Sequence, residues 1–203
     1  MKLSMLRLLF VPMLLLFSCV GPKTDNEETP DSITMQLTTS QIQQIRSKTG
    51  WSDTILAALG SMAEAEIYMN ASLKEASVGG RKALIRQDID WSDFSCRKEW
   101  LKQKLADWSR WQDYNNADLI GEGYPPRDKN GDPYELHHIG QHQDSPFAEL
   151  TWAEHMGDGN NAILHPNRES EIDRQRFEQE KSQYWQARYK MFSQQELDEI
   201  YNK

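Results

Sequence analysis

Cysteine is scarce in this sequence: Cys19 and Cys96 are the only two among 203 residues. Cys19 ends the N-terminal segment considered below, and if it is modified there, Cys96 has no partner within the chain. A disulfide framework and a cysteine-based metal site are then excluded. We expect Cys96 to be a small buried side chain.

Basic residues are also fewer than acidic ones, 23 Lys and Arg against 31 Asp and Glu. The net charge is −8, and residues 116–203 account for all of it, with nine Lys and Arg against 17 Asp and Glu. Such a surface is poorly suited to holding nucleic-acid phosphates. Apolar residues are present at ordinary frequency, 38%, with seven tryptophans. The chain is therefore long and apolar enough for one good core or two small ones.

The N-terminal apolar run, residues 8–17, is too short to span a bilayer comfortably. Two basic residues precede it and Cys19 follows, which is typical of an export signal. The segment that ends at Cys19 resembles the lipobox of bacterial lipoproteins. The resemblance implies a signal peptide over residues 1–18 and a lipid on Cys19. The alternative is an uncleaved signal-anchor helix. The lipid would hold the protein on a membrane, at the bacterial outer membrane or cell surface, through a flexible tether over residues 19–37.

Residues 38–115 show helical periodicity. Ser52 is a candidate N-cap, with Trp51 and Leu56 as a hydrophobic staple around it. The apolar stripe that follows consists of Ile55, Leu56, Leu59, Met62 and Ala63. Val78-Gly79-Gly80 interrupts the pattern, and a second helix is expected from about Ser95. Its large side chains share one stripe and are therefore expected in the core rather than as a base-stacking platform: Trp100, Leu101, Leu105 and Trp108.

From Asp118 the composition changes to turn residues, with Asn130-Gly131 as the strongest tight-turn signal. Strands are expected from Tyr134 to Ile139 and from about Phe147 to Leu150. Thr151 and Glu154 fit a capping box for a short helix, and a long helix is expected over about 170–192, with 193–203 as a tail. The sequence thus predicts an α+β fold that is mostly helical: a helical segment, a strand–loop–strand–helix finger and a long C-terminal helix.

All five histidines of the chain lie in one short window, at positions 137, 138, 142, 155 and 165. Phosphodiester hydrolysis needs an activated water, a cation to offset the added negative charge, and stabilisation of the leaving oxygen. A neutral imidazole acting as base and one divalent ion held by two or three imidazoles meet these needs.

A set of short motifs around these histidines occurs in order. It comprises Gly123-Tyr124-Pro125, Asp128 to Gly131, Glu135-Leu136-His137-His138-Ile139-Gly140-Gln141, Ala148-Glu149-Leu150-Thr151, Glu154-His155, Gly159-Asn160 and Ile163-Leu164-His165. Together they closely resemble the LHH family of HNH/endonuclease VII nucleases, often found as the toxin tips of bacterial polymorphic toxins. The resemblance covers about 116–192 and is faintly continued upstream, at Glu64, Glu66 to Tyr68 and Ala83 to Ile85. It implies a ββα-metal finger and a nuclease activity on nucleic acid, DNA more than RNA, and a toxin would need an immunity protein.

The same resemblance implies roles for particular residues. His137, His155 and His165 would hold one divalent ion, Mg, Zn or similar, and His138 would be the general base. Glu135 would orient catalytic groups, and Asn160 or Asn161 would hold the base by a hydrogen bond. His142 is expected to be a solvent-exposed or loop-bonding histidine.

One difficulty and two alternatives remain at this stage. Neighbours on a regular strand point to opposite faces, so His137 and His138 can line one site only if the strand ends or bulges, for which Gly140 is the candidate bend. Seven basic residues could gather on one side and offset the acidic surface, or belong to an ordinary mixed-charge helix surface: Arg127, Lys129, Arg168, Arg174, Arg176, Arg188 and Lys190. The alternatives are a non-catalytic, membrane-anchored protein that keeps the finger as a structural metal site for binding a partner, and a small helical lipoprotein without metal.

Overall fold

The structure is a computed structural model that describes residues 37–94, 108–166 and 170–203. The predicted signal peptide with Cys19, the tether up to residue 36, and most of the helix predicted from Ser95, with Cys96, lie outside the described residues. In the described part of the chain, no helix has the length and apolar content needed to cross a membrane.

Three helices open the described chain: α1 (Thr39–Thr49), α2 (Asp53–Ala58) and α3 (Met62–Asn70). A capping box between Thr38 and Gln41 begins α1, and Gly50 ends it in the left-handed conformation that glycine adopts without strain. Ser52 precedes α2 as predicted, but its hydroxyl donates to Glu75 instead of capping the helix. The predicted apolar stripe is broken, because the chain leaves the helix at Leu59 and starts again after Ser61.

The prediction of helix up to Asn115 is wrong between residues 74 and 85, where β1 (Lys74–Val78) and β2 (Arg81–Ile85) form an antiparallel hairpin. Gly79 and Gly80, which the sequence shows as a break, form the two-residue turn. Both have positive φ, 58° and 85°, as the tight hairpin turns that suit twisted strands require.

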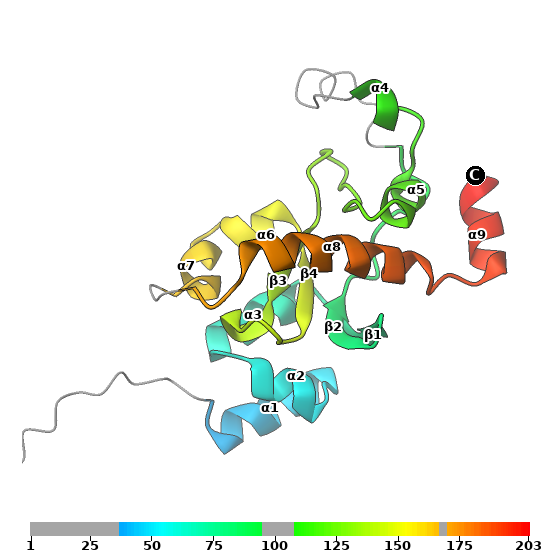
Figure 1. Ribbon diagram of the computed structural model, residues 1–203. Helices are drawn as coiled ribbons and strands as arrows, with labels where there is room; N and C mark the ends of the chain where they lie inside the picture. The colour runs from blue at the N-terminus through cyan, green and yellow to red at the C-terminus, as the bar shows by residue number, and fades with distance from the viewer. Residues whose placement is uncertain (1–36, 95–107, 167–169) are drawn as a thin grey trace, which may run out of the picture. The chain divides into compact units, whose positions relative to one another are not determined.

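The hairpin joins β3 (Glu135–His138) and β4 (Phe147–Leu150) in one four-stranded sheet of order β1-β2-β4-β3. Strands β2 and β4 are parallel, with Leu84 opposite Ala148, whereas β3 and β4 are antiparallel, with His137 opposite Ala148. The sheet therefore unites residues from both sequence segments, and the α+β class predicted from the sequence is confirmed (Figure 1).

Each face of the sheet has its own apolar core. Leu84, Ala148 and Leu150 pack with buried residues of α1, α2, α3 and α7 (Asn160–Leu164). The alternate residues, such as Ala83 and Phe147, pack on the other face with α5 (Asn116–Gly121) and α8 (Arg174–Tyr189). The period-two alternation of strand side chains divides the two cores.

The remaining elements are α4 (Trp108–Trp111), the 3₁₀ turn η3 (Ile139–Gln141), α6 (Trp152–Met156) and α9 (Gln194–Tyr201). Strand β4 and the capping box of Thr151 with Glu154 are as predicted. The long helix α8 is shorter than predicted, starting at an N-cap at Asp173. Three helices of the described chain were missed: α5 lies in the predicted turn region, α7 between the predicted short and long helices, and α9 in the predicted tail.

A buried ionic network ties β4 to α8. Glu149 is fully buried and accepts from the Arg86 backbone N–H, the Tyr184 hydroxyl and Arg188 Nε. Burial raises the pKa of Glu149, and the charge of Arg188 opposes this. Because one donor, Arg86, directly follows β2 and the other two, Tyr184 and Arg188, lie on α8, the network fixes the position of the sheet against α8.

Candidate metal centre

Three histidines from three elements converge on one point. His137 lies on β3, His155 on α6, and His165 directly follows α7. One ring nitrogen from each can be chosen so that all three lie within 4.8 Å of one another. The ring centroids are 4.8 to 5.2 Å apart and the rings meet edge to face. These are the three residues for which the sequence predicted a metal site.

Local structure fixes each ring. The regular strand β3 turns His137 toward the core that contains Leu150 and Leu164, where it is 2% exposed. The capping box of Thr151 sets the start of α6 and hence the position of His155. The left-handed Gly159 starts α7, and buried Leu164 anchors its end beside His165.

Hydrogen bonds select the nitrogens that remain available to a cation. Nδ1 of His155 pairs with the carboxylate of Glu135 in a short contact, and Nδ1 of His165 lies 3.1 Å from the Asn161 carbonyl oxygen. Both acceptors favour a proton on Nδ1, which leaves Nε2 as the ligand atom. A metal-binding histidine typically directs its second nitrogen at a carboxylate or carbonyl in this way.

The spacing suits a metal ion. Nδ1 of His137 and Nε2 of His155 are 3.2 Å apart. In a tetrahedral site with metal–nitrogen distances of about 2.0–2.1 Å, two ligand nitrogens lie about 3.3 Å apart. The donor set could therefore hold one divalent ion, and the spacing of His137 and His155 matches that of two ligands of such an ion.

The electrostatics agree with this fit. Burial, and then the neighbouring rings of His155 and His165, hold the pKa of His137 well below its usual value. Burial and His155 also lower the pKa of His165. Neutral imidazoles are the form that binds metal.

The structure does not bring His138 to this cluster, so the expectation that four imidazoles meet is wrong. Strand β3 is regular through His138, and the side chain of His138 lies on the opposite face, against Phe147 and Phe177. It is 2% exposed, and its Nε2 lies 3.6 Å from Glu180 and has no hydrogen-bond partner among the residues that the structure describes. Burial, and then the charge of Arg81, lower its pKa to about 4.

Gly140 bends the chain as predicted, but the bend serves another contact. Its φ is 69°, and an added Cβ would lie 2.1 Å from the carbonyl oxygen of Ala58. Its backbone N–H donates to Glu64 of α3 at 2.7 Å. The bend therefore docks the turn after β3 on the N-terminal helices.

Asn160, Asn161 and His142 do not belong to the histidine cluster and make other hydrogen bonds. The side chain of Asn160 donates to the Glu154 carbonyl, which ties α7 to α6, and does not contact His138. Asn161 acts through its backbone carbonyl on His165. His142 is exposed and pairs with Glu171 at 2.8 Å, in line with the expectation of a loop-bonding histidine.

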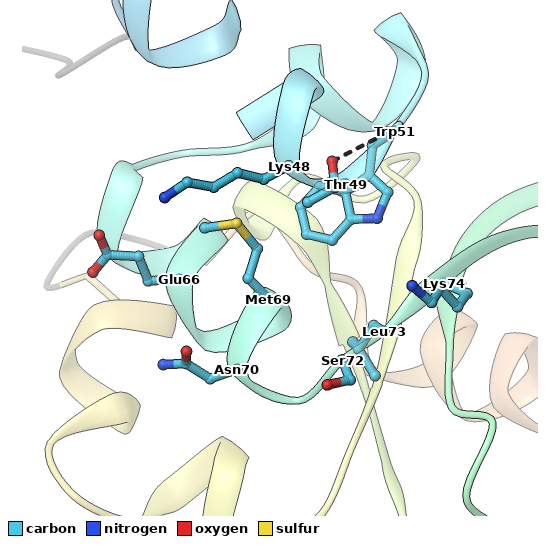
Figure 2. A pocket seen from close by; sticks show the side chains of 9 residues that line it. All are labelled: Lys48, Thr49, Trp51, Glu66, Met69, Asn70, Ser72, Leu73 and Lys74. Carbon is cyan, nitrogen blue, oxygen red and sulfur yellow. Dashed lines mark hydrogen bonds between the residues drawn. The ribbon is translucent and has the colours of Figure 1, made fainter. Parts of the chain in front are cut away.

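A groove of about 470 Å³ reaches the cluster from one side. His155 and Glu135 lie on its wall, together with Tyr124 and Lys181. A second hollow, between α1, α3 and the start of β1, is lined by Lys48, Trp51 and Met69 among others and contains none of the clustered histidines (Figure 2). Of these two hollows, the first is the one lined by a clustered histidine, His155.

The gathering of basic residues on one side is not found for its members on α8. Arg188 is buried on Glu149, and Arg176 is paired with Asp144 and Glu180. Arg174 is exposed, and its charge contributes to lowering the pKa of His165. Arg168 lies outside the described residues.

Sequence reasoning gave Glu64 no role, although the residue faces His137. Its position in the chain carries no motif signal, because the contact depends on how α3 packs beside β3. The one available signal was the weak upstream similarity around Glu64 to Tyr68.

Comparison with known proteins gives one match. No curated protein and no solved structure matches the chain. Residues 115–191 match the LHH family, described as a nuclease of the HNH/ENDO VII superfamily with conserved LHH. The segment that contains all three clustered histidines is therefore similar to the LHH nucleases of the HNH/endonuclease VII superfamily.

Proposed function

We propose that the protein is a metal-dependent endonuclease that hydrolyses phosphodiester bonds of nucleic acid, DNA more readily than RNA. The observation that carries the proposal is the convergence of His137, His155 and His165 within the segment that matches a nuclease family. The hydrogen bonds at Nδ1 of His155 and of His165 also support it, because they leave Nε2 of each ring available to a cation.

His137, His155 and His165 are the ligands in this proposal. The bound ion supplies positive charge that offsets the charge added to the phosphate during hydrolysis. Glu135 fixes the orientation and tautomer of His155. Three protein ligands leave one open position, which is typical of catalytic rather than structural zinc sites.

Two side chains are candidates for the base that takes the proton from water. His138 is the base by family resemblance and is neutral at pH 7, but it faces the other side of β3. Glu135 is the base by position, since it lies at the wall of the groove beside His155. Replacing each in turn decides between them if kcat is measured with the metal site saturated, because Glu135 also holds the ligand His155: removal of the true base lowers kcat about 10²–10⁴-fold.

The surface near the site favours contact with bases over contact with many phosphates. Trp152 and Met156 of α6 and Ile163 of α7 are exposed, and they belong to the two helices that carry or precede His155 and His165. Exposed aromatic side chains stack on unpaired bases independently of sequence. The expected substrate is therefore nucleic acid with accessible bases, and single-stranded DNA should be cleaved faster than duplex.

We further propose that Cys19 carries a lipid that holds the enzyme at the bacterial outer membrane or cell surface. The basic start, short apolar run and cysteine of residues 2–19 support this. A toxin role, with an immunity protein as partner, follows only from the family resemblance. Incorporation of labelled fatty acid by the full chain, absent in Cys19→Ser, tests the anchor.

The test of the activity is cleavage of plasmid and single-stranded DNA and of RNA by purified protein with Mg²⁺, Mn²⁺ or Zn²⁺. Cleavage should be lost in His155→Ala and kept in His142→Ala, a matched control because His142 is exposed and pairs with Glu171 outside the cluster. Equal inertness of the wild-type protein and the His155 variant with every metal would refute the proposal.

A second candidate function is a structural metal site that binds a partner without cleavage. The sealed position of His138 and the acidic surface favour it. It predicts that the protein binds one metal ion per chain tightly, loses much of its stability when the ion is chelated, and hydrolyses no nucleic acid.

A further inference from the structure

Glu64 is a buried carboxylate on α3, outside the segment 115–191 that matches the nuclease family. It is 3% exposed. It accepts three hydrogen bonds, from the backbone N–H groups of Gly60 and Gly140 at 2.6 and 2.7 Å and from the Tyr68 hydroxyl at 2.7 Å. Burying a carboxylate is unfavourable unless other groups compensate it. Gly60 and Tyr68 each lie four residues from Glu64, whereas Gly140 lies in the turn that directly follows β3, so these bonds hold the carboxylate beside the strand that carries His137.

The facing group is His137. Oε1 of Glu64 lies 3.8 Å from Nε2 of His137, and both side chains are almost fully buried. This distance is longer than a hydrogen bond, so the pair is aligned but not joined. The other ring nitrogen, Nδ1, is the one that lies 3.2 Å from Nε2 of His155.

Nε2 of the Gln141 side chain lies 3.5 Å from both ring nitrogens of His137 and does not distinguish them. Their other neighbours differ: His155 lies next to Nδ1 and Glu64 next to Nε2. A cation bound at Nδ1 requires the ring proton to be on Nε2, where it points toward Glu64. A small approach of the ring would complete a charge-assisted hydrogen bond there.

We propose that Glu64 is a positioning residue of the metal centre, which accepts the Nε2 proton of His137 and makes the N-terminal helices part of the site. The inference rests on the proposed metal site. With Glu64 in this role, the ring nitrogen that does not bind the metal has an acceptor in each histidine. The acceptors are Glu64 for His137, Glu135 for His155, and the Asn161 carbonyl for His165. Two of these acceptors are carboxylates, whose charges together balance a divalent cation.

The first test is the zinc affinity of the full chain, measured by calorimetry and by competition with a chelating dye. Glu64→Gln should weaken binding about 10- to 100-fold, as loss of such an outer partner does. Glu149→Gln is the matched control, because Glu149 is also fully buried and accepts three hydrogen bonds but lies on the opposite face of the sheet. Its zinc affinity should stay within about threefold of wild type. Equal losses in the two variants, or wild-type affinity in Glu64→Gln, would overturn the proposal.

The second test uses wild-type protein alone, so it does not depend on whether a variant folds. In zinc-loaded wild-type protein with ¹⁵N-labelled histidine, the His137 ring should be protonated at Nε2 and bound at Nδ1. The reverse arrangement would overturn the proposal. If wild type binds zinc as described but cleaves no nucleic acid, the nuclease proposal fails while the role of Glu64 stands. If wild type binds none of Zn²⁺, Mn²⁺ and Mg²⁺, both fail.

Discussion

Replacing Gly140 with alanine tests how the turn after β3 docks on the N-terminal helices. Gly140 has φ 69°, and its added Cβ would lie 2.1 Å from the backbone oxygen of Ala58. A backbone atom cannot swing aside as a side chain can, so the turn must move. That movement also breaks the hydrogen bond from the Gly140 N–H to Glu64.

The expected cost has two parts. A left-handed conformation costs a non-glycine residue about 1–2 kcal/mol. Loss of a hydrogen bond to a charged acceptor adds about 1.5–3 kcal/mol. Gly140→Ala should therefore lower the free energy of unfolding by about 3–5 kcal/mol.

Gly50→Ala is the matched control. Gly50 has nearly the same φ, 71°, but an added Cβ would meet nothing within 4 Å. Only the conformational cost applies, about 1–2 kcal/mol. Urea unfolding followed by tryptophan fluorescence measures both variants, and Gly140→Ala should also bind zinc more weakly. Equal destabilisation of the two variants would refute the reasoning, because it would show that the close contact and the bond to Glu64 contribute nothing.

Three other outcomes are expected. Arg188→Met leaves the buried Glu149 without its main charge partner and should cost about 3–5 kcal/mol in chemical unfolding, with unchanged zinc affinity. In metal-free protein, His138 takes up a proton near pH 6.5 in the unfolded chain but near pH 4 in the folded one. Its contribution to stability, measured as the difference between wild type and His138→Gln, should therefore be complete above pH 6.5 and fall by up to about 3 kcal/mol as pH drops to 4, in addition to the losses from His137 and His165, whose pKa values are also lowered. Chelation of zinc held at about 100 times its Kd should remove about 2.7 kcal/mol, seen as a fall in Tm that His155→Ala does not show.

The sequence was most informative where the structure is local. The strand Phe147–Leu150 and the Thr151 capping box depend on neighbouring residues and were predicted correctly. The three histidines that converge were recognisable because the family motifs fix the order of strand, loop and helix around them.

Long-range packing was what the sequence could not show. The hairpin at residues 74–85 gave no clear strand signal, because its strands are only five residues long and β2 ends in three consecutive apolar residues, Ala83, Leu84 and Ile85, without polar alternation. Its parallel pairing with β4, and the contact of Glu64 with His137, join residues more than 60 positions apart. No periodicity signals such a contact.

His138 shows both the value and the limit of such reasoning. The alternation of side chains along a strand correctly raised doubt that His137 and His138 share one site. The bend at Gly140 comes too late to reverse His138, because β3 is regular through that residue.

The most direct test of the account is the coordination of the bound metal in the full chain, measured by metal analysis and X-ray absorption at the zinc edge. The account predicts one zinc per chain with three imidazole nitrogens at about 2.0–2.1 Å. The zinc content should be lower in each of His137→Ala, His155→Ala and His165→Ala. Zinc-supplemented protein that contains no bound metal, or binding that survives all three substitutions, would contradict it.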